Sequence, residues 1–236
     1  MEADLAKLKV MCARSMHVAV GALGKAFAQA AGHEIAFDFA TVGALQDKLD
    51  AGDAADVVIV SVGMIDALEK ARALVPGSRK NIARTFIALC TRAGAPKPGF
   101  AARDEFVRTL MNARAIATSD PAVGGSAGVH LARMFEREGL AAMLAGKCLP
   151  QKSGVEVARR VVEGKADFGL TLSGEIASVE GAVIAGPVPP PFGLDTAYCA
   201  AVIAASDAKT AAADFIAVLT KPEARETWRK AGFEVE

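Results

Sequence analysis

Hydroxyl side chains follow three apolar runs near the start of the chain. They are Ser15 after residues 8–13, Thr41 after residues 35–40, and Ser61 at the end of residues 56–61. Short apolar runs of this kind predict buried strands, and the spacing of the residues after them predicts helices. A serine or threonine at such a junction can cap the helix or donate a hydrogen bond to a ligand. The chemistry that these residues favour is the binding of a small anion.

The hydroxyl groups at these junctions have competing structural roles. We predict that Ser15 is the N-cap of a helix that ends before Gly32, and that its hydroxyl also contacts a ligand. A simple strand-to-helix turn and an anion-facing turn remain equally open for Thr41 and Gly43. For Ser61, ligand contact is weighed against an ordinary position at a strand end.

A second group of candidate ligand-binding residues lies further along the chain. The sequence Gly124-Gly125-Ser126 precedes a predicted helix, and the free N–H groups at a helix start can bind an anion. Ser173 directly follows the predicted strand 166–172 and is a further candidate. We therefore expect amide and hydroxyl donors in both halves of the chain.

Three titratable side chains near these groups could supply a general base: His17, His130 and Glu175. A lone histidine is more often packed or exposed than catalytic. A carboxylate such as Glu175 would repel an anion, so a structural partner or a solvated residue at a helix start is the favoured interpretation of Glu175.

Cysteine usage argues against metal and thiol chemistry. None of the four cysteines forms a C-x-x-C pair, and the three histidines are scattered, so neither a metal site nor a cofactor is expected. Cys12, Cys90 and Cys199 lie in apolar runs and are predicted to be small buried residues.

The composition excludes two broad classes of function. Lys plus Arg and Asp plus Glu both total 27, so the net charge is zero and the basic excess of a non-specific nucleic-acid binder is missing. No apolar run reaches the roughly 18–20 residues of a membrane span, so we expect no membrane insertion. The polar start of the chain does not resemble a secretory signal, which leaves a cytoplasmic protein or a mature form as alternatives.

The order of the predicted elements explains how these groups could be brought together. The first 75 residues alternate strand and helix, which predicts an α/β fold with a parallel sheet. Ligands bind such sheets outside the carboxyl ends of the strands. Long apolar runs at 82–91 and 196–205 are candidates for strands that cross between two lobes. The expected lobes are residues 1–82 with 204–236, and residues 83–203.

Several motifs in combination resemble the molybdate-binding proteins of ABC transporters, which have the two-lobed type II periplasmic binding protein fold. The resemblance covers nearly the whole chain, and its pieces are Ala13-Arg-Ser15, Phe39-Ala-Thr-Val-Gly-Ala-Leu, Ala51-Gly-Asp-Ala-Ala-Asp-Val-Val-Ile, Asp120-Pro with Ala127-Gly128, and Thr220-Lys-Pro-Glu-Ala with Gly232-Phe. This resemblance implies that each lobe is a mainly parallel sheet flanked by helices, and that two crossover strands form a hinge.

The family holds a tetrahedral oxyanion with hydroxyls and backbone N–H groups. The resemblance implies that Ser15 is a ligand serine and that Ser61, Ala127 and Val155 donate backbone N–H groups. Two positions depart from the family pattern: Val42 replaces a second ligand serine, and Leu172 replaces a ligand tyrosine. A lost charge-assisted hydrogen bond costs about 1.5–3 kcal/mol, so these departures weaken the case for molybdate itself. The segments Thr41-Val-Gly, Gly124-Gly-Ser-Ala-Gly and Ser173-Gly-Glu-Ile resemble a divergent branch of the family that includes aconitate isomerase.

Two functions follow from this resemblance. The first is passive capture of a small anion, either an oxyanion such as molybdate or a small carboxylate, in an interlobe cleft in the periplasm for an ABC transporter. The second is isomerisation of a small unsaturated tricarboxylate in the same cleft. That reaction needs a general base, drawn from His17, His130 or Glu175, and donors that stabilise an enolate. Neither function needs a nucleic-acid partner.

Overall fold

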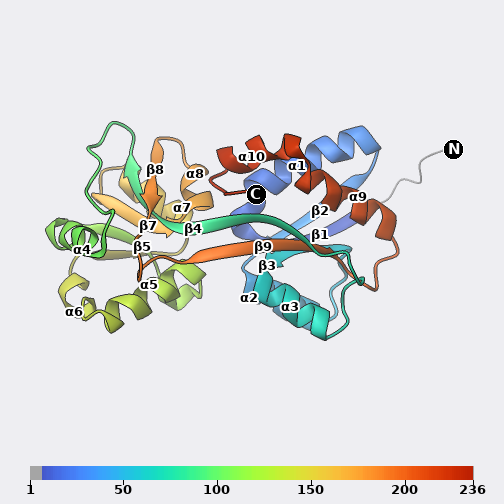
Figure 1. Ribbon diagram of the computed structural model, residues 1–236, viewed down its shortest axis with the longest axis horizontal. Helices are drawn as coiled ribbons and strands as arrows, with labels where there is room; N and C mark the ends of the chain where they lie inside the picture. Colours follow the sequence, from blue (N-terminus) through green and yellow to red (C-terminus); the bar gives the residue numbers. More distant parts are fainter. Residues whose placement is uncertain (1–6, 236) are drawn as a thin grey trace. The chain divides into compact units, whose positions relative to one another are not determined.

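The chain folds into two compact units in the computed structural model, which describes residues 7–235 (Figure 1). Unit 1 combines the chain up to Arg84 with the chain from Thr196 onward, and unit 2 is Thr85–Asp195. The second boundary therefore falls after the first residue of strand β9 (Asp195–Val202), whereas the sequence had placed it after this segment. The physical reason is strand pairing, because Tyr198–Val202 pairs with a strand of unit 1.

Unit 1 contains a four-stranded sheet in the order β2-β1-β3-β9. The strands β2 (Glu34–Ala40), β1 (Lys7–Ala13) and β3 (Val57–Ser61) are parallel, and β9 is antiparallel to β3. Its helices are α1 (His17–Ala31), α2 (Val42–Asp50), α3 (Val62–Lys70), α9 (Lys209–Thr220) and α10 (Arg225–Lys230). The predicted alternation of strands and helices in the first part of the chain is confirmed.

Both faces of the unit 1 sheet are buried, which explains why β3 is apolar at successive positions. Val57 and Ile59 belong to one core cluster, together with residues of α1, α9 and α10. Val58 and Val60 belong to the other cluster, with residues of α2 and α3. A parallel strand covered on both faces needs an apolar side chain at every position. Helices therefore cover both faces of β3, which ends at Ser61.

Unit 2 contains most of β4 (Lys80–Arg92), which begins in unit 1. The strand order is β8-β4-β7-β5-β6. The strands β5 (Ile116–Ser119), β6 (Cys148–Gln151) and β7 (Phe168–Leu172) are parallel, whereas β4 is antiparallel to β7 and to β8 (Ala182–Pro187). The helices are α4 (Arg103–Asn112), α5 (Ser126–Arg137), α6 (Ala141–Leu144), α7 (Gly154–Val162) and α8 (Ser173–Ala177).

Two strands of unit 2, β6 and β8, were not anticipated. The strand β6 is four residues long, contains Pro150 and is only partly buried, so it carries no apolar alternation. The strand β8 follows Gly181 and alternates only weakly. A 3-10 turn, Pro222–Ala224, leads into α10, and Pro222 starts that turn as its fixed φ favours.

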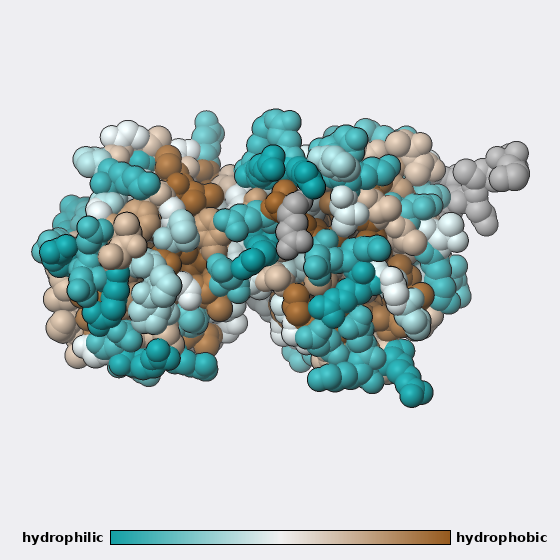
Figure 2. All heavy atoms as spheres, in the orientation of Figure 1, coloured by the Kyte–Doolittle hydropathy of each residue, from teal (hydrophilic) through white to brown (hydrophobic). Residues whose placement is uncertain are grey.

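Hydrophilic side chains are spread over both units in the view of Figure 2. Among residues 7–235, every helix falls short of the length and hydropathy that a membrane crossing requires.

Candidate functional site

The carboxyl ends of three parallel strands lie at one edge of unit 1. The pairs Ala13–Ala40 and Cys12–Ile59 place the ends of β1, β2 and β3 at similar levels. Ser15 and Thr41 lie just after β1 and β2, and Ser61 is the last residue of β3, so the fold brings these three predicted site residues to the same edge of this unit.

Ser15 is held by a long-range contact rather than by a helix cap. It lies in the 3-10 turn Arg14–Met16, and the N-cap of α1 is Met16, so the predicted capping role of Ser15 is wrong. The 3-10 turn moves the helix start past the serine. Its Oγ instead lies 3.0 Å from the Tyr198 hydroxyl on β9. Sequence reasoning missed Tyr198, although a single tyrosine in a buried apolar strand is a signal because its hydroxyl needs a partner.

The other two hydroxyls at this edge differ in what they bind. The Thr41 hydroxyl caps α2 by accepting a hydrogen bond of 3.3 Å from the Ala44 N–H, beside Val42 and Gly43 in the first turn. Ser61 is the N-cap residue of α3, yet its side chain makes no capping bond. Within the described chain the half-buried Ser61 hydroxyl has no hydrogen-bond partner. Unlike the hydroxyls of Ser15 and Thr41, it is therefore available to donate to a ligand.

In unit 2, the turn between β5 and α5 carries the predicted glycine-rich segment. Gly125 is the N-cap of α5, and no side chain caps this helix. Ser126 is exposed at the first helical position, and Ala127 and Gly128 are buried behind it. A Cβ on Gly128 would lie 2.6 Å from the carbonyl oxygen of Ser119, so only glycine lets α5 start this close to β5. The uncapped N–H groups of this twelve-residue helix are potential anion donors.

At the start of α7, near Val155, the protein supplies its own anion. The Gly154 N–H donates a hydrogen bond of 3.1 Å to Glu175 Oε1, and the Thr171 hydroxyl donates one of 2.9 Å to Oε2. Thr171 also lies 3.2 Å from the Ser119 hydroxyl. Negative charge at a helix start is stabilising. Glu175 therefore acts as a structural partner of α7, and Val155 is the next residue after the amide that Glu175 binds.

The two predicted site residues at the end of β7 face the interior. Leu172 is buried and is the N-cap of α8. Ser173 is fully buried, and its Oγ lies 2.8 Å from the Thr85 hydroxyl and 3.4 Å from the Phe86 N–H. The Ser173 hydroxyl thus ties α8 to β4.

The two histidines considered as bases lie in different units. His17 Nδ1 lies 2.9 Å from the Arg14 carbonyl oxygen, and its exposed ring meets Phe39 edge-on. His130 follows Ser126 by one helical turn on α5, so the two residues share a face of the helix. His130 Nε2 is buried and has no hydrogen-bond partner among the described residues.

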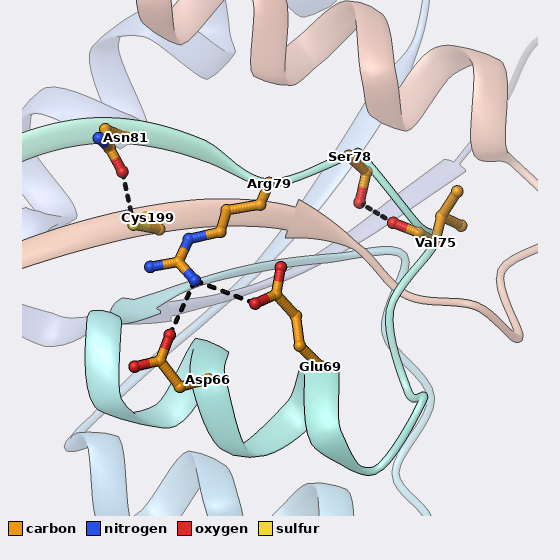
Figure 3. Close-up of polar contacts among 7 residues, drawn as sticks. All are labelled: Asp66, Glu69, Val75, Ser78, Arg79, Asn81 and Cys199. Carbon is orange, nitrogen blue, oxygen red and sulfur yellow. Dashed lines mark hydrogen bonds and ion pairs between the residues drawn. The ribbon is translucent and has the colours of Figure 1, made fainter.

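Three cysteines, Cys12, Cys90 and Cys199, are packed as core residues. Burial raises the pKa of Cys12 well above its usual range and raises the pKa of Cys90 to about 12. Burial also raises the pKa of Cys199, whose Sγ donates to Asn81 Oδ1 at 3.2 Å (Figure 3). A protonated thiol is a poor nucleophile. In the part of the chain that the structure describes, no three His, Cys, Asp or Glu side chains gather as metal ligands would.

Comparison with known proteins identifies the class. Residues 8–234 match the family described as bacterial extracellular solute-binding proteins, and the chain belongs to this family. It is 30% identical over 195 residues to an aconitate isomerase from a Pseudomonas species, an alignment that covers 81% of this chain and 71% of that protein.

Solved structures show the same fold. A domain from Clostridium difficile, described as the substrate-binding domain of a molybdenum ABC transporter, has a TM-score of 0.78 at 19% identity and covers 98% of this chain and 100% of that one. The periplasmic molybdate-binding protein of Azotobacter vinelandii has a TM-score of 0.72 at 21% identity over 97% and 99% of the two chains. The sulfate-binding protein SubI of Mycobacterium tuberculosis has a TM-score of 0.67 at 20% identity over 98% and 88%. The predicted type II periplasmic binding protein fold is confirmed.

Proposed function

We propose that the protein captures a small anion, an oxyanion or a small carboxylate, for an ABC transporter in the periplasm. The observation that carries this proposal is the Ser61 hydroxyl, which occupies a helix N-cap position but leaves its own helix uncapped. A hydroxyl in that state is available to a ligand. Ser15 at the same edge of unit 1 and the uncapped start of α5 in unit 2 supply further neutral donors.

Neutral donors suit an anion because they form hydrogen bonds with its charge. They leave no uncompensated charge in the site when the anion is absent. Hydrogen bonds to a charged acceptor contribute about 1.5–3 kcal/mol each, which corresponds to tenfold or more in affinity. The matching family and the solute names of its structural neighbours support this function.

Ser61→Ala is expected to weaken anion binding about tenfold or more, because it deletes one charge-assisted hydrogen bond. Its free energy of unfolding should change by less than about 0.5 kcal/mol, since the side chain caps nothing. A thermal-shift screen with molybdate, sulfate, cis-aconitate and trans-aconitate finds the ligand, because a ligand at about 100 times its Kd stabilises by about 2.7 kcal/mol. Isothermal titration then compares the variant with the wild type.

Ser78→Ala is the matched control in unit 1. Its hydroxyl donates to the Val75 carbonyl at 2.7 Å (Figure 3). It also accepts from the Val202 N–H at 3.1 Å, so the variant should lose stability and keep its affinity. If none of the four anions raises the melting temperature of the wild type, anion capture is rejected.

A second candidate function, aconitate isomerisation, is favoured by the aconitate isomerase relative and by the orientation of Glu175. In an allylic shift, a base removes a proton from carbon, donors stabilise the enolate, and the proton returns at the other end of the allyl system. Hydrogen bonds from the Gly154 N–H and the Thr171 hydroxyl hold the Glu175 carboxylate in position. His130, with its unpartnered Nε2, is the alternative base.

If the protein isomerises aconitate and Glu175 is the base, Glu175→Gln should lower kcat about 10²–10⁴-fold, the usual contribution of a positioned base. The conversion of cis- to trans-aconitate is followed by NMR. Glu156→Gln is the control, because Glu156 lies in the first turn of α7 and, among the described residues, its carboxylate accepts a hydrogen bond only from the Lys152 N–H just before that helix. Binding of aconitate by the wild type without turnover would leave capture as the sole function.

A further inference from the structure

A hydroxyl pair in unit 1 extends the proposed binding site beyond the residues that the sequence suggested. Ser15 Oγ and Tyr198 Oη are 3.0 Å apart, although 183 positions separate them in the chain. Tyr198 is only 4% exposed and lies opposite Ser61 in the antiparallel register of β3 and β9. The pairing of β9 with β3 therefore brings Tyr198 to the edge where Ser15 and Ser61 lie.

Tyr198 is held more firmly than Ser15. It lies in a strand whose following residues are all buried, and its ring meets the Phe233 ring edge-on at a centroid distance of 6.4 Å. A tyrosine has only two side-chain torsions, so packing of the ring fixes its hydroxyl at low entropic cost. Ser15 has no helix to cap, and its contact with Tyr198 is what fixes its rotamer.

The chemistry gives this contact a direction when an anion is bound. An anion accepts hydrogen bonds only, so a serine that binds it must donate its single proton to it. The Ser15 oxygen is then an acceptor for the Tyr198 hydroxyl, which is the more acidic of the two groups. Hydrogen bonds in such a chain polarise and strengthen one another.

We propose that Tyr198 is a positioning residue of the anion site, which orients Ser15 and donates a hydrogen bond to it so that Ser15 donates to the ligand. The proposal rests on the anion-binding function proposed above. It adds a residue from the second segment of unit 1, which lies far along the sequence from every ligand position that the family resemblance suggested but next to Ser15 in space.

A double-mutant cycle tests this role, with molybdate and cis-aconitate as probes in isothermal titrations. We expect Ser15→Ala and Tyr198→Phe each to weaken binding of the bound probe about tenfold, the value of one hydrogen bond to a charged group. The double variant should bind no more weakly than the weaker single variant, because removal of either hydroxyl already breaks the chain. Thermal unfolding of all variants shows whether the substitutions act on affinity or only on folding.

The outcomes show whether the role of Tyr198 fails alone or together with anion capture. If the losses of the single variants multiply in the double variant, or if Tyr198→Phe lowers stability and leaves affinity intact, the positioning role is refuted while anion capture stands. If the wild type binds neither probe, anion capture of this kind and the role of Tyr198 are rejected together.

Discussion

Gly128→Ala is expected to lower the free energy of unfolding by about 1–3 kcal/mol, the usual cost of inserting a methyl group where there is no space. The new Cβ would lie 2.6 Å from the Ser119 carbonyl oxygen and 3.1 Å from the Asp120 carbonyl carbon. These are backbone atoms at the end of β5, so they cannot rotate away as a side chain would. Relief requires α5 to move from the sheet, which displaces the N–H groups at its start.

Gly128→Ala should therefore lose anion affinity as well as stability. Urea unfolding gives the change in stability, and titration of the folded variant gives the change in Kd. Gly21→Ala in the interior of α1 is the control, because its Cβ would meet no atom within 4 Å. Replacing an unhindered helical glycine should stabilise the protein by about 0.5–1 kcal/mol. Equal stability of the Gly128 and Gly21 variants would disprove the close approach of α5 to β5.

Trp228→Ala is expected to cost about 3–5 kcal/mol of unfolding free energy in unit 1, the range for truncation of a large buried aromatic residue. Trp228 is 1% exposed in the main core cluster, and its ring packs edge-on against Phe233. Its indole N–H donates to the Leu219 carbonyl oxygen at the end of α9 over 2.9 Å. Loss of this side chain leaves a cavity where α9 and α10 meet.

Trp228→Phe separates the two contributions. It keeps an aromatic ring but removes the donor to Leu219, so its cost should lie nearer to the 1–3 kcal/mol of an unsatisfied buried carbonyl. Since Trp228 is the only tryptophan, circular dichroism rather than fluorescence must follow unfolding in both variants. A cost of Trp228→Ala below that of Trp228→Phe would contradict this account of the core.

Local sequence patterns predicted the strands and helices that carry the site. The apolar run before Ser61 became β3 because helices cover both of its faces, and Gly32 ends α1 in the left-handed conformation as expected. The strand β6 escaped prediction because a short, half-exposed strand with Pro150 has no periodic signal. Periodicity reports burial, so elements with a weak burial pattern leave little trace in the sequence.

By itself, the sequence determined the alternating α/β order, the balanced charge without a membrane-spanning run, the positions of Ser15 and Ser61 near strand ends, and the position of Ser126 at a helix start. Only the tertiary structure decided what each polar group binds. It joined Ser15 to Tyr198, placed Glu175 on the Gly154 amide, and turned the Ser173 hydroxyl toward Thr85. The physical reason is that hydrogen-bond partners 21 to 183 positions apart are chosen by strand pairing and packing, which no local spacing encodes.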